Sequence, residues 1–100
     1  MEVIFHRLAA QEYNRALLWY ARRSQSAARR FERGVEEAMR LIGSTPQLGT
    51  PYDQDHRSVP VRRFPYRLFY TAASSTQIVI VAVAHTSRRP GYWRRRHPGV

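Results

Sequence analysis

Four residues whose side chains suit phosphate chemistry fall close to two consecutive segments of strand character. Arg67 lies near the start of the first segment, His85 ends the second, and Arg88 and Tyr92 follow shortly after. Histidine shuttles protons near neutral pH, and arginine holds a phosphate and stabilises the charge that develops on it. A tyrosine stacks on a base or transfers a proton. These four residues are therefore the predicted catalytic group of a phosphate-cleaving site.

The geometry of a β-hairpin brings these residues together. Antiparallel pairing around the turn Ser74-Ser75-Thr76 places Arg67 beside Ala84, one residue from His85. The start of one strand and the end of its neighbour then meet at one end of the sheet. Nearby cations are expected to lower the pKa of His85 toward that of a usable base. The arginines within a few residues of this point are Arg62, Arg63, Arg88 and Arg89.

Each candidate also has a structural interpretation. Arg67 could be a solvated strand residue or the partner of Asp53 or Asp55, and His85 could be a structural residue at a strand end. Tyr92 and Trp93 could cover the open face of the sheet. The run of arginines from 94 to 96 could be a solvated tail or a site for phosphate or an acidic partner.

Charge points to an anionic partner. The chain of 100 residues has a formal net charge of +10 and a pI of about 11.4, and every one of its 17 basic residues is arginine. Arginine is always charged and offers a planar fork that suits phosphate and carboxylate. The predicted partner is a nucleic acid or a strongly acidic protein segment. Besides the catalytic group, the candidate binding residues are Arg57, Arg62, Arg63, Arg89, Arg94, Arg95 and Arg96.

Composition argues against metal and cofactor chemistry. The chain has no cysteine, its acidic residues are few and scattered, and no histidine pair has the spacing of metal ligands. The N-terminus does not resemble a signal peptide, and the longest apolar run, 78–84, is far shorter than the roughly 20 residues of a membrane helix. We expect one domain spanning residues 1–100, in the cytoplasm, with no cofactor and no metal.

The hydrophobic pattern predicts the elements that position these residues. A short strand over 2–6 precedes two helices, one from Leu8 to Arg22 or Arg23 and one from the serines at 24–26 to Gly43. Three strands follow, and Pro90 could open a short C-terminal helix. These strands are predicted at 57–61, 66–72 and 77–84. The expected class is α+β, with a helical hairpin packed on one face of a mainly antiparallel four-stranded sheet. Pro60 limits its strand to an edge or a bulge, and the last strand is apolar on both faces.

The order of these motifs resembles the RelE/ParE superfamily of toxins from type II toxin–antitoxin systems. The resemblance rests on a helix with Trp19-Tyr20, on "P-x-L-G" at 46–49, on "R-x-F-P-Y-R-L-F-Y" at 62–70 and on "I-V-A-V-A-H-T-S-R-R-P-G-Y-W" at 80–93. It covers about residues 3 to 96. The resemblance implies a toxin that arrests growth and is neutralised, in a hetero-oligomer, by an antitoxin whose acidic C-terminal segment wraps it.

Two activities are implied within this superfamily. RelE-like members cut messenger RNA at the ribosome without a metal; Arg67 matches a phosphate-contacting arginine of these nucleases, and His85 and Tyr92 match catalytic positions of two different branches. ParE-like members inhibit DNA gyrase and cut nothing. The paired lysines of RelE itself are missing, since Ser58 and Pro60 occupy the nearest positions. The predicted function is messenger RNA cleavage, with gyrase inhibition as an alternative and a basic nucleic-acid-binding module as a further one.

Overall fold

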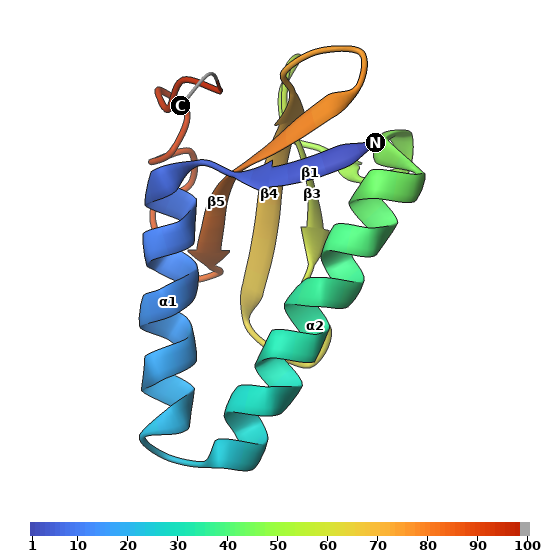
Figure 1. Cartoon of the computed structure of the whole chain (residues 1–100). Coiled ribbons are helices and arrows are strands. Elements are labelled where there is room, and N and C mark those ends of the chain that lie inside the picture. The colour runs from blue at the N-terminus through green and yellow to red at the C-terminus, as the bar shows by residue number, and fades with distance from the viewer. Residues whose placement is uncertain (99–100) are drawn as a thin grey trace.

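The computed structural model describes residues 1–98, which form two helices and a twisted sheet (Figure 1). The helices are α1 (Arg7–Ala21) and α2 (Gln25–Ser44), followed by the single 3₁₀ turn η1 (Pro46–Leu48). The strands are β1 (Glu2–Phe5), β2 (Thr50–Pro51), β3 (Arg57–Pro60), β4 (Tyr66–Ala72) and β5 (Gln77–His85). Within residues 1–98, neither α1 nor α2 has the length and hydrophobicity of a transmembrane helix.

The sheet has the order β1-β5-β4-β3-β2, with only the β1–β5 pair parallel. The predicted α+β class is therefore confirmed, but the expected number of four strands is wrong because β2 adds a fifth. This two-residue strand pairs with β3 inside a segment of loop-like composition, so no periodicity could reveal it. Pro60 lies beyond the residues that β2 pairs with, and its missing N–H therefore faces no partner strand.

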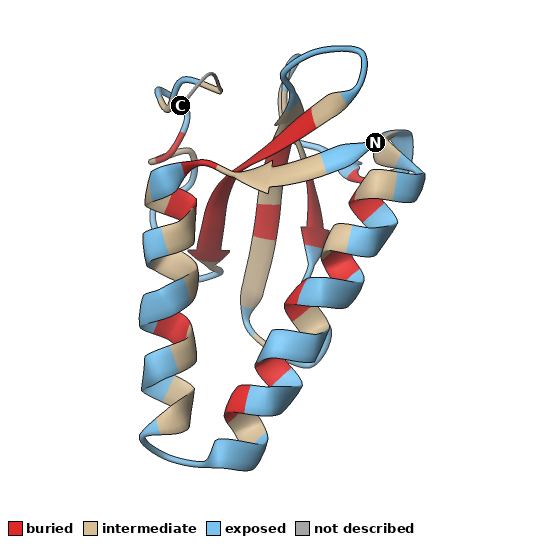
Figure 2. Cartoon of the chain, viewed as in Figure 1, coloured by how far each residue is buried: buried red, intermediate tan, exposed pale blue. Residues whose placement is uncertain are grey.

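The two helices pack against one face of the sheet. Ser24 caps α2 by accepting a hydrogen bond from the Ala27 N–H at 3.1 Å, as the serine-rich linker predicts. Figure 2 shows the buried residues of α2 facing the sheet and the exposed residues facing away. The buried stripe is Ala28, Phe31, Val35, Ala38 and Ile42. Its helical spacing explains why this part of the core could be predicted.

The opposite face of the sheet is covered by the C-terminal segment. Trp93 is 1% exposed and packs with buried β5 residues such as Val79 and Val81, which confirms that it covers the sheet. The sequence predicts a short helix over 91–96 or a tail after Pro90, and the helix does not form. Gly91 has a φ of 74°, outside the helical range, and the segment forms turns in which Arg94 and Arg96 donate backbone hydrogen bonds three residues back. Burial of Trp93 holds this segment flat on the sheet.

At the end of the last hairpin that is farthest from its turn, the two strands pair as predicted. Arg67 pairs with Ala84, and Tyr66 pairs with His85. Because side chains alternate between the faces of a strand, Arg67 and His85 leave the sheet on opposite faces. Arg67 is on the face covered by the C-terminal segment, and His85 is on the helix face beside Tyr66. Both remain at the same end of the sheet.

Candidate functional site

Two hollows meet at this end of the sheet, and both His85 and Arg88 line each of them. The first lies between α1 and the end of β5 and has a volume of about 440 Å³. The second lies on the other face, beside the C-terminal segment, and has a volume of about 460 Å³. His85 and Arg88 therefore stand on the border between two binding spaces.

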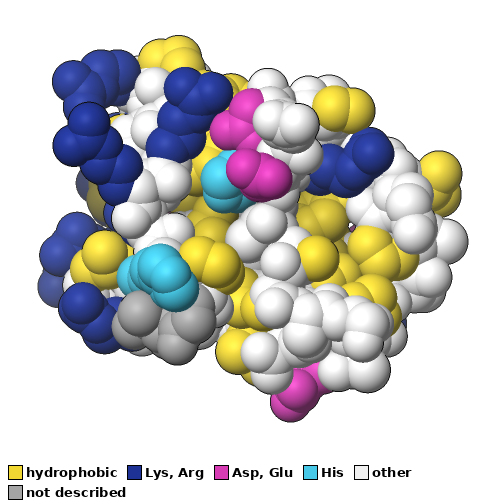
Figure 3. All heavy atoms as spheres, turned by 90° about the horizontal axis from the view of Figure 1, so that it is seen from above, with side chains coloured by type: hydrophobic (Ala, Val, Ile, Leu, Met, Phe, Trp, Pro, Cys, Tyr) yellow, Lys and Arg dark blue, Asp and Glu magenta, His cyan; other side chains and the backbone are white. Residues whose placement is uncertain are grey.

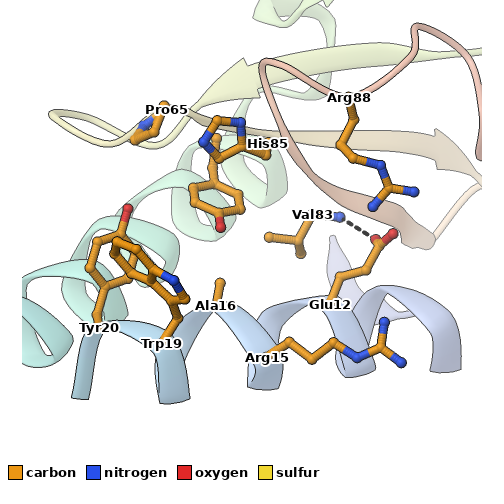
Figure 4. Close-up of a pocket in the computed structure, with 10 residues that line it drawn as sticks. Glu12, Arg15, Ala16, Trp19, Tyr20, Pro65, Val83, His85 and Arg88 are labelled. Atoms are coloured by element: carbon orange, nitrogen blue, oxygen red, sulfur yellow. Dashed lines mark hydrogen bonds between the residues drawn. The ribbon is translucent and has the colours of Figure 1, made fainter. Parts of the chain in front are cut away.

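The helix-side hollow has an aromatic wall. Figure 4 shows Trp19 and Tyr20 of α1 on one side and Pro65 and His85 on the other. The His85 ring meets the Tyr66 ring edge-on, with centroids 5.1 Å apart. Trp19 is half exposed. A half-exposed tryptophan beside a hollow is a common anchor for a protein partner.

The orientation of the His85 ring is fixed by Ser87. The ring Nδ1 accepts a hydrogen bond from the Ser87 N–H at 3.0 Å and lies 2.8 Å from Ser87 Oγ. A nitrogen that accepts a hydrogen bond carries no proton, so the neutral ring bears its proton on Nε2. In this arrangement Nε2 is a hydrogen-bond donor. Acting as a base at Nε2 would require His85 to change tautomer.

Glu12 of α1 joins the helix to the end of the sheet. Its carboxylate accepts hydrogen bonds from the Val83 N–H at 3.0 Å, from the Tyr92 hydroxyl at 2.7 Å and from both terminal nitrogens of Arg96 at 2.9 Å. Figure 4 shows Glu12 pointing from α1 to the Val83 backbone. The Val83 N–H lies on the part of β5 beyond its pairing with β1, which ends at Phe5. Sequence reasoning missed Glu12, because a single glutamate on a helix gives no signal of this role.

Tyr92 is tied into the same network. Burial, the hydrogen bond to Glu12 and the charge of that carboxylate together raise its pKa well above the ordinary value. The Arg88 guanidinium carbon lies 4.1 Å from the centre of the Tyr92 ring. Tyr92 therefore stays protonated near neutral pH, and its hydroxyl donates to a carboxylate within the protein.

Arg67 lies in the second hollow with several aromatic residues. Its Nε donates to Ser58 Oγ at 2.9 Å, and one terminal nitrogen lies 3.4 Å from Thr50 Oγ1. Pairing of Arg67 with Asp53 or Asp55 is therefore wrong. The aromatic lining consists of Tyr52, Phe69, Tyr92 and Trp93. This hollow combines a fixed cation with aromatic surface.

The other predicted binding arginines separate into groups. Arg89 lines the second hollow and Arg95 is exposed. Two others have structural contacts, because Arg57 donates to the Gly49 carbonyl at 2.9 Å and Arg96 pairs with Glu12. Arg62 and Arg63 line a different hollow, beside α2. Figure 3, a view from above, shows arginine side chains gathered on one side, next to a histidine in contact with acidic side chains.

Asp53 lies at the centre of a clamp, a set of hydrogen bonds that joins the loop before β3 to the C-terminal segment. Its carboxylate accepts hydrogen bonds from the Asp55 N–H at 2.9 Å, from the His56 ring at 2.9 Å and from Arg94 Nε at 3.2 Å. Burial alone would raise the pKa of Asp53, but these hydrogen bonds outweigh it and lower the pKa to about 2. The His56 ring also meets the Trp93 ring, with centroids 4.8 Å apart. The clamp holds the C-terminal segment on the sheet.

This clamp predicts a loss of stability in acid. The folded pKa of Asp53, about 2, is below its ordinary value of 3.8, so its contribution is fully present above about pH 5. As the pH falls toward 2, about 1–2 kcal/mol of unfolding free energy should be lost. Urea unfolding at several pH values measures this loss. Asp53→Asn should flatten the profile in that window, and an unchanged profile would contradict the role of the clamp.

Residues 1–98 contain no group of three histidine, aspartate or glutamate side chains placed to hold a metal ion. The hollows at the sheet end are lined mainly by arginine, aromatic and hydroxyl side chains. Such surfaces suit an anionic or aromatic ligand, or a partner protein that brings acidic side chains.

Comparison with known proteins gives one family. Residues 3–90 match the family described as ParE toxin of the type II toxin–antitoxin system parDE. A search of curated proteins found no match. The matched range begins within β1, extends through β5 and ends just after Arg88 and Arg89.

Proposed function

The chain belongs to the ParE toxin family of type II toxin–antitoxin systems, and from this premise we propose that it arrests growth by binding and inhibiting DNA gyrase. In this proposal the basic sheet end is a contact surface and performs no bond cleavage. Arg88 and Arg89 on its border are exposed, and Trp19 is half exposed. Arginine and tryptophan are the side chains that most often dominate the energy of protein interfaces.

The observation that carries this proposal is the state of the candidate catalytic groups. The Tyr92 hydroxyl donates to Glu12, His85 Nδ1 accepts from Ser87, and Arg67 Nε donates to Ser58. A general base needs a lone pair that can reach a proton of the substrate. Neither a protonated Tyr92 nor the Nε2–H tautomer of His85 supplies one at the hollow. These groups support binding better than acid–base catalysis.

The proposed antitoxin contact follows from charge. A chain with a net charge of +10 attracts an acidic segment, and the helix-side hollow offers the aromatic wall that such a segment needs for anchoring. We propose that the acidic C-terminal segment of the antitoxin covers this hollow in a hetero-oligomer. Gyrase and antitoxin would then compete for the same arginines.

The test is a supercoiling assay with purified gyrase, relaxed plasmid DNA and the purified full chain. Supercoiling should fall as the chain is added in the micromolar range, and an added acidic antitoxin segment should restore it. A translation reaction with the same chain serves as the control and should run to completion. Absence of any effect on supercoiling at micromolar concentration would contradict the proposal.

Cleavage of messenger RNA is the second candidate. It is favoured by the position of Arg67, His85 and Arg88 around one end of the sheet. A phosphate of the RNA could meet the proton donor His85 and the cationic arginines there. In this case the translation reaction would stop and truncated messages would accumulate. Supercoiling would continue at the same concentration of the chain.

A further inference from the structure

Four arginines gather around a hollow that shares no residue with the two at the sheet end. Arg30 and Arg33 reach it from α2, and Arg62 and Arg63 reach it from the loop between β3 and β4. Its volume is about 510 Å³, and its remaining lining residues are Gly34, Glu37 and Phe64. Four guanidiniums and one carboxylate give the hollow an excess of positive charge. The ion pairs of the described residues involve Asp53 and Glu12 and none of these arginines.

The backbone at Arg63 is unusual for this residue type. Its φ is 70°, and it is the one non-glycine residue of the described chain with a positive φ. It occupies the third position of a turn closed by a hydrogen bond from the Phe64 N–H to the Val61 carbonyl, at 3.1 Å. Glycine or asparagine is usual at that position, and an arginine there costs about 1 kcal/mol. This cost is explained if the positive charge of Arg63 has a function.

Gly34 permits the close approach that forms the cluster. A Cβ atom added to Gly34 would lie 3.0 Å from a methyl group of Val61, next to Arg62. A glycine inside a helix costs about 1 kcal/mol relative to alanine. At this position it allows the middle of α2 to contact the loop that carries Arg62 and Arg63. Two local departures from common residue preferences thus converge on one basic hollow.

We propose that this cluster binds the phosphate backbone of duplex DNA. The chain would then be an inhibitor that contacts DNA as well as gyrase. The choice of DNA rests on the proposed function, because gyrase acts on duplex DNA. Arginines fixed on a helix and a tight turn suit a regular array of phosphates. An amphipathic acidic peptide would need apolar anchor pockets. This hollow offers only Phe64, and the apolar residues Ala38, Leu41 and Pro60 line the adjoining hollow, away from Arg30, Arg33 and Arg63. The Phe64 ring meets Phe31 and Tyr20 edge-on, with centroids 5.2 and 5.0 Å away, and is only partly exposed as a stacking platform for single-stranded bases.

The test compares the salt dependence of DNA binding for matched variants of the full chain. Binding of a labelled duplex of about 20 base pairs is followed by fluorescence anisotropy from about 50 to about 200 mM salt. The slope of log K against log salt, where K is the binding constant, is negative. The double variant Arg30→Gln with Arg33→Gln should make it shallower by about 2, since each phosphate contact contributes about 0.9. Arg29→Gln with Arg40→Gln removes the same charge from exposed positions of the same helix outside the hollow. This control should make the slope shallower by less than about 1.

Arg63→Gly separates binding from folding. Glycine accepts the positive φ, so this variant should be more stable than the original chain by about 1 kcal/mol, yet its DNA slope should become shallower by about 1. Equal slopes for the cluster and control variants would overturn the proposal. Tighter binding of duplex RNA, or of poly-glutamate, would overturn the choice of DNA. Supercoiling measured in parallel distinguishes the two proposals. Equal DNA slopes for the cluster and control variants, with inhibition by the original chain intact, would reject this inference and leave gyrase inhibition standing. Shallower slopes for the cluster variants, with no inhibition by the original chain, would reject gyrase inhibition and leave DNA binding standing.

Discussion

Arg88→Ala is expected to raise the concentration of chain needed for half-inhibition of gyrase by about tenfold or more, the usual effect of removing an interface hot spot. Arg88 lines both hollows at the sheet end, and it is exposed. Its guanidinium lies over the Tyr92 ring, and it takes part in no ion pair among the described residues. Supercoiling assays over a range of concentrations measure this effect.

The matched control is Arg22→Ala, which removes an exposed arginine just after the C-terminal end of α1. Both variants lose one positive charge, and both should keep the unfolding free energy of the original chain within about 0.5 kcal/mol. Only Arg88→Ala should weaken inhibition. If the two variants weaken inhibition equally, net charge and not the sheet end determines activity.

Glu12→Ala is expected to lower the unfolding free energy by about 3–5 kcal/mol, the effect of breaking a buried ion pair by removing one partner. The side chains of Glu12 and Arg96 are 11% and 15% exposed, so little water can replace the lost contact. The Tyr92 hydroxyl and the Val83 N–H lose their acceptor at the same time. Urea unfolding followed by circular dichroism gives the difference.

Two further variants show whether the effect belongs to this network. Glu12→Gln keeps one oxygen that can accept hydrogen bonds and should lose less stability than Glu12→Ala. Glu36→Ala removes an exposed carboxylate from α2 and should stay within about 0.5 kcal/mol of the original chain. A loss below about 1 kcal/mol for Glu12→Ala would mean that the network contributes little to the fold.

Most of the fold follows from local patterns in the sequence. The apolar stripe from Ala28 to Ile42 has helical spacing, and Ser24 is a common N-cap residue. The turn at 74–76 predicts the register of the last hairpin to within one residue. The pairing of Arg67 with Ala84 also depends on a β-bulge between Phe69 and Tyr70, which shifts the register by one residue and which the sequence did not reveal. The buried run of β5 indicates cover on both faces, which α1 and Trp93 provide.

The missed features depend on contacts between residues far apart in the sequence. β2 has two residues, and it exists because Thr50 and Pro51 meet β3. Glu12 and Arg96 are separated by most of the chain, so neither residue signals the other. The turn that replaces the expected C-terminal helix depends on the burial of Trp93 against the sheet.

The candidate site could be located by sequence but not described in chemical terms. Hairpin pairing predicts that Arg67 and His85 lie at one end of the sheet, and they do. The side on which each side chain leaves the sheet follows from the alternation of faces. What the pattern could not reveal is that Ser87 fixes the His85 ring and that Glu12 holds the Tyr92 hydroxyl. These contacts shift the interpretation from cleavage toward binding.

The most direct test of this account is the order in which syntheses stop in cells that express the chain. Incorporation of labelled thymidine and of labelled amino acids is followed in parallel after induction, without antitoxin. Inhibition of gyrase predicts that DNA synthesis falls first, while messages on ribosomes stay full-length. An early stop of protein synthesis with messages cut at the ribosome, and DNA synthesis still running, would contradict the account.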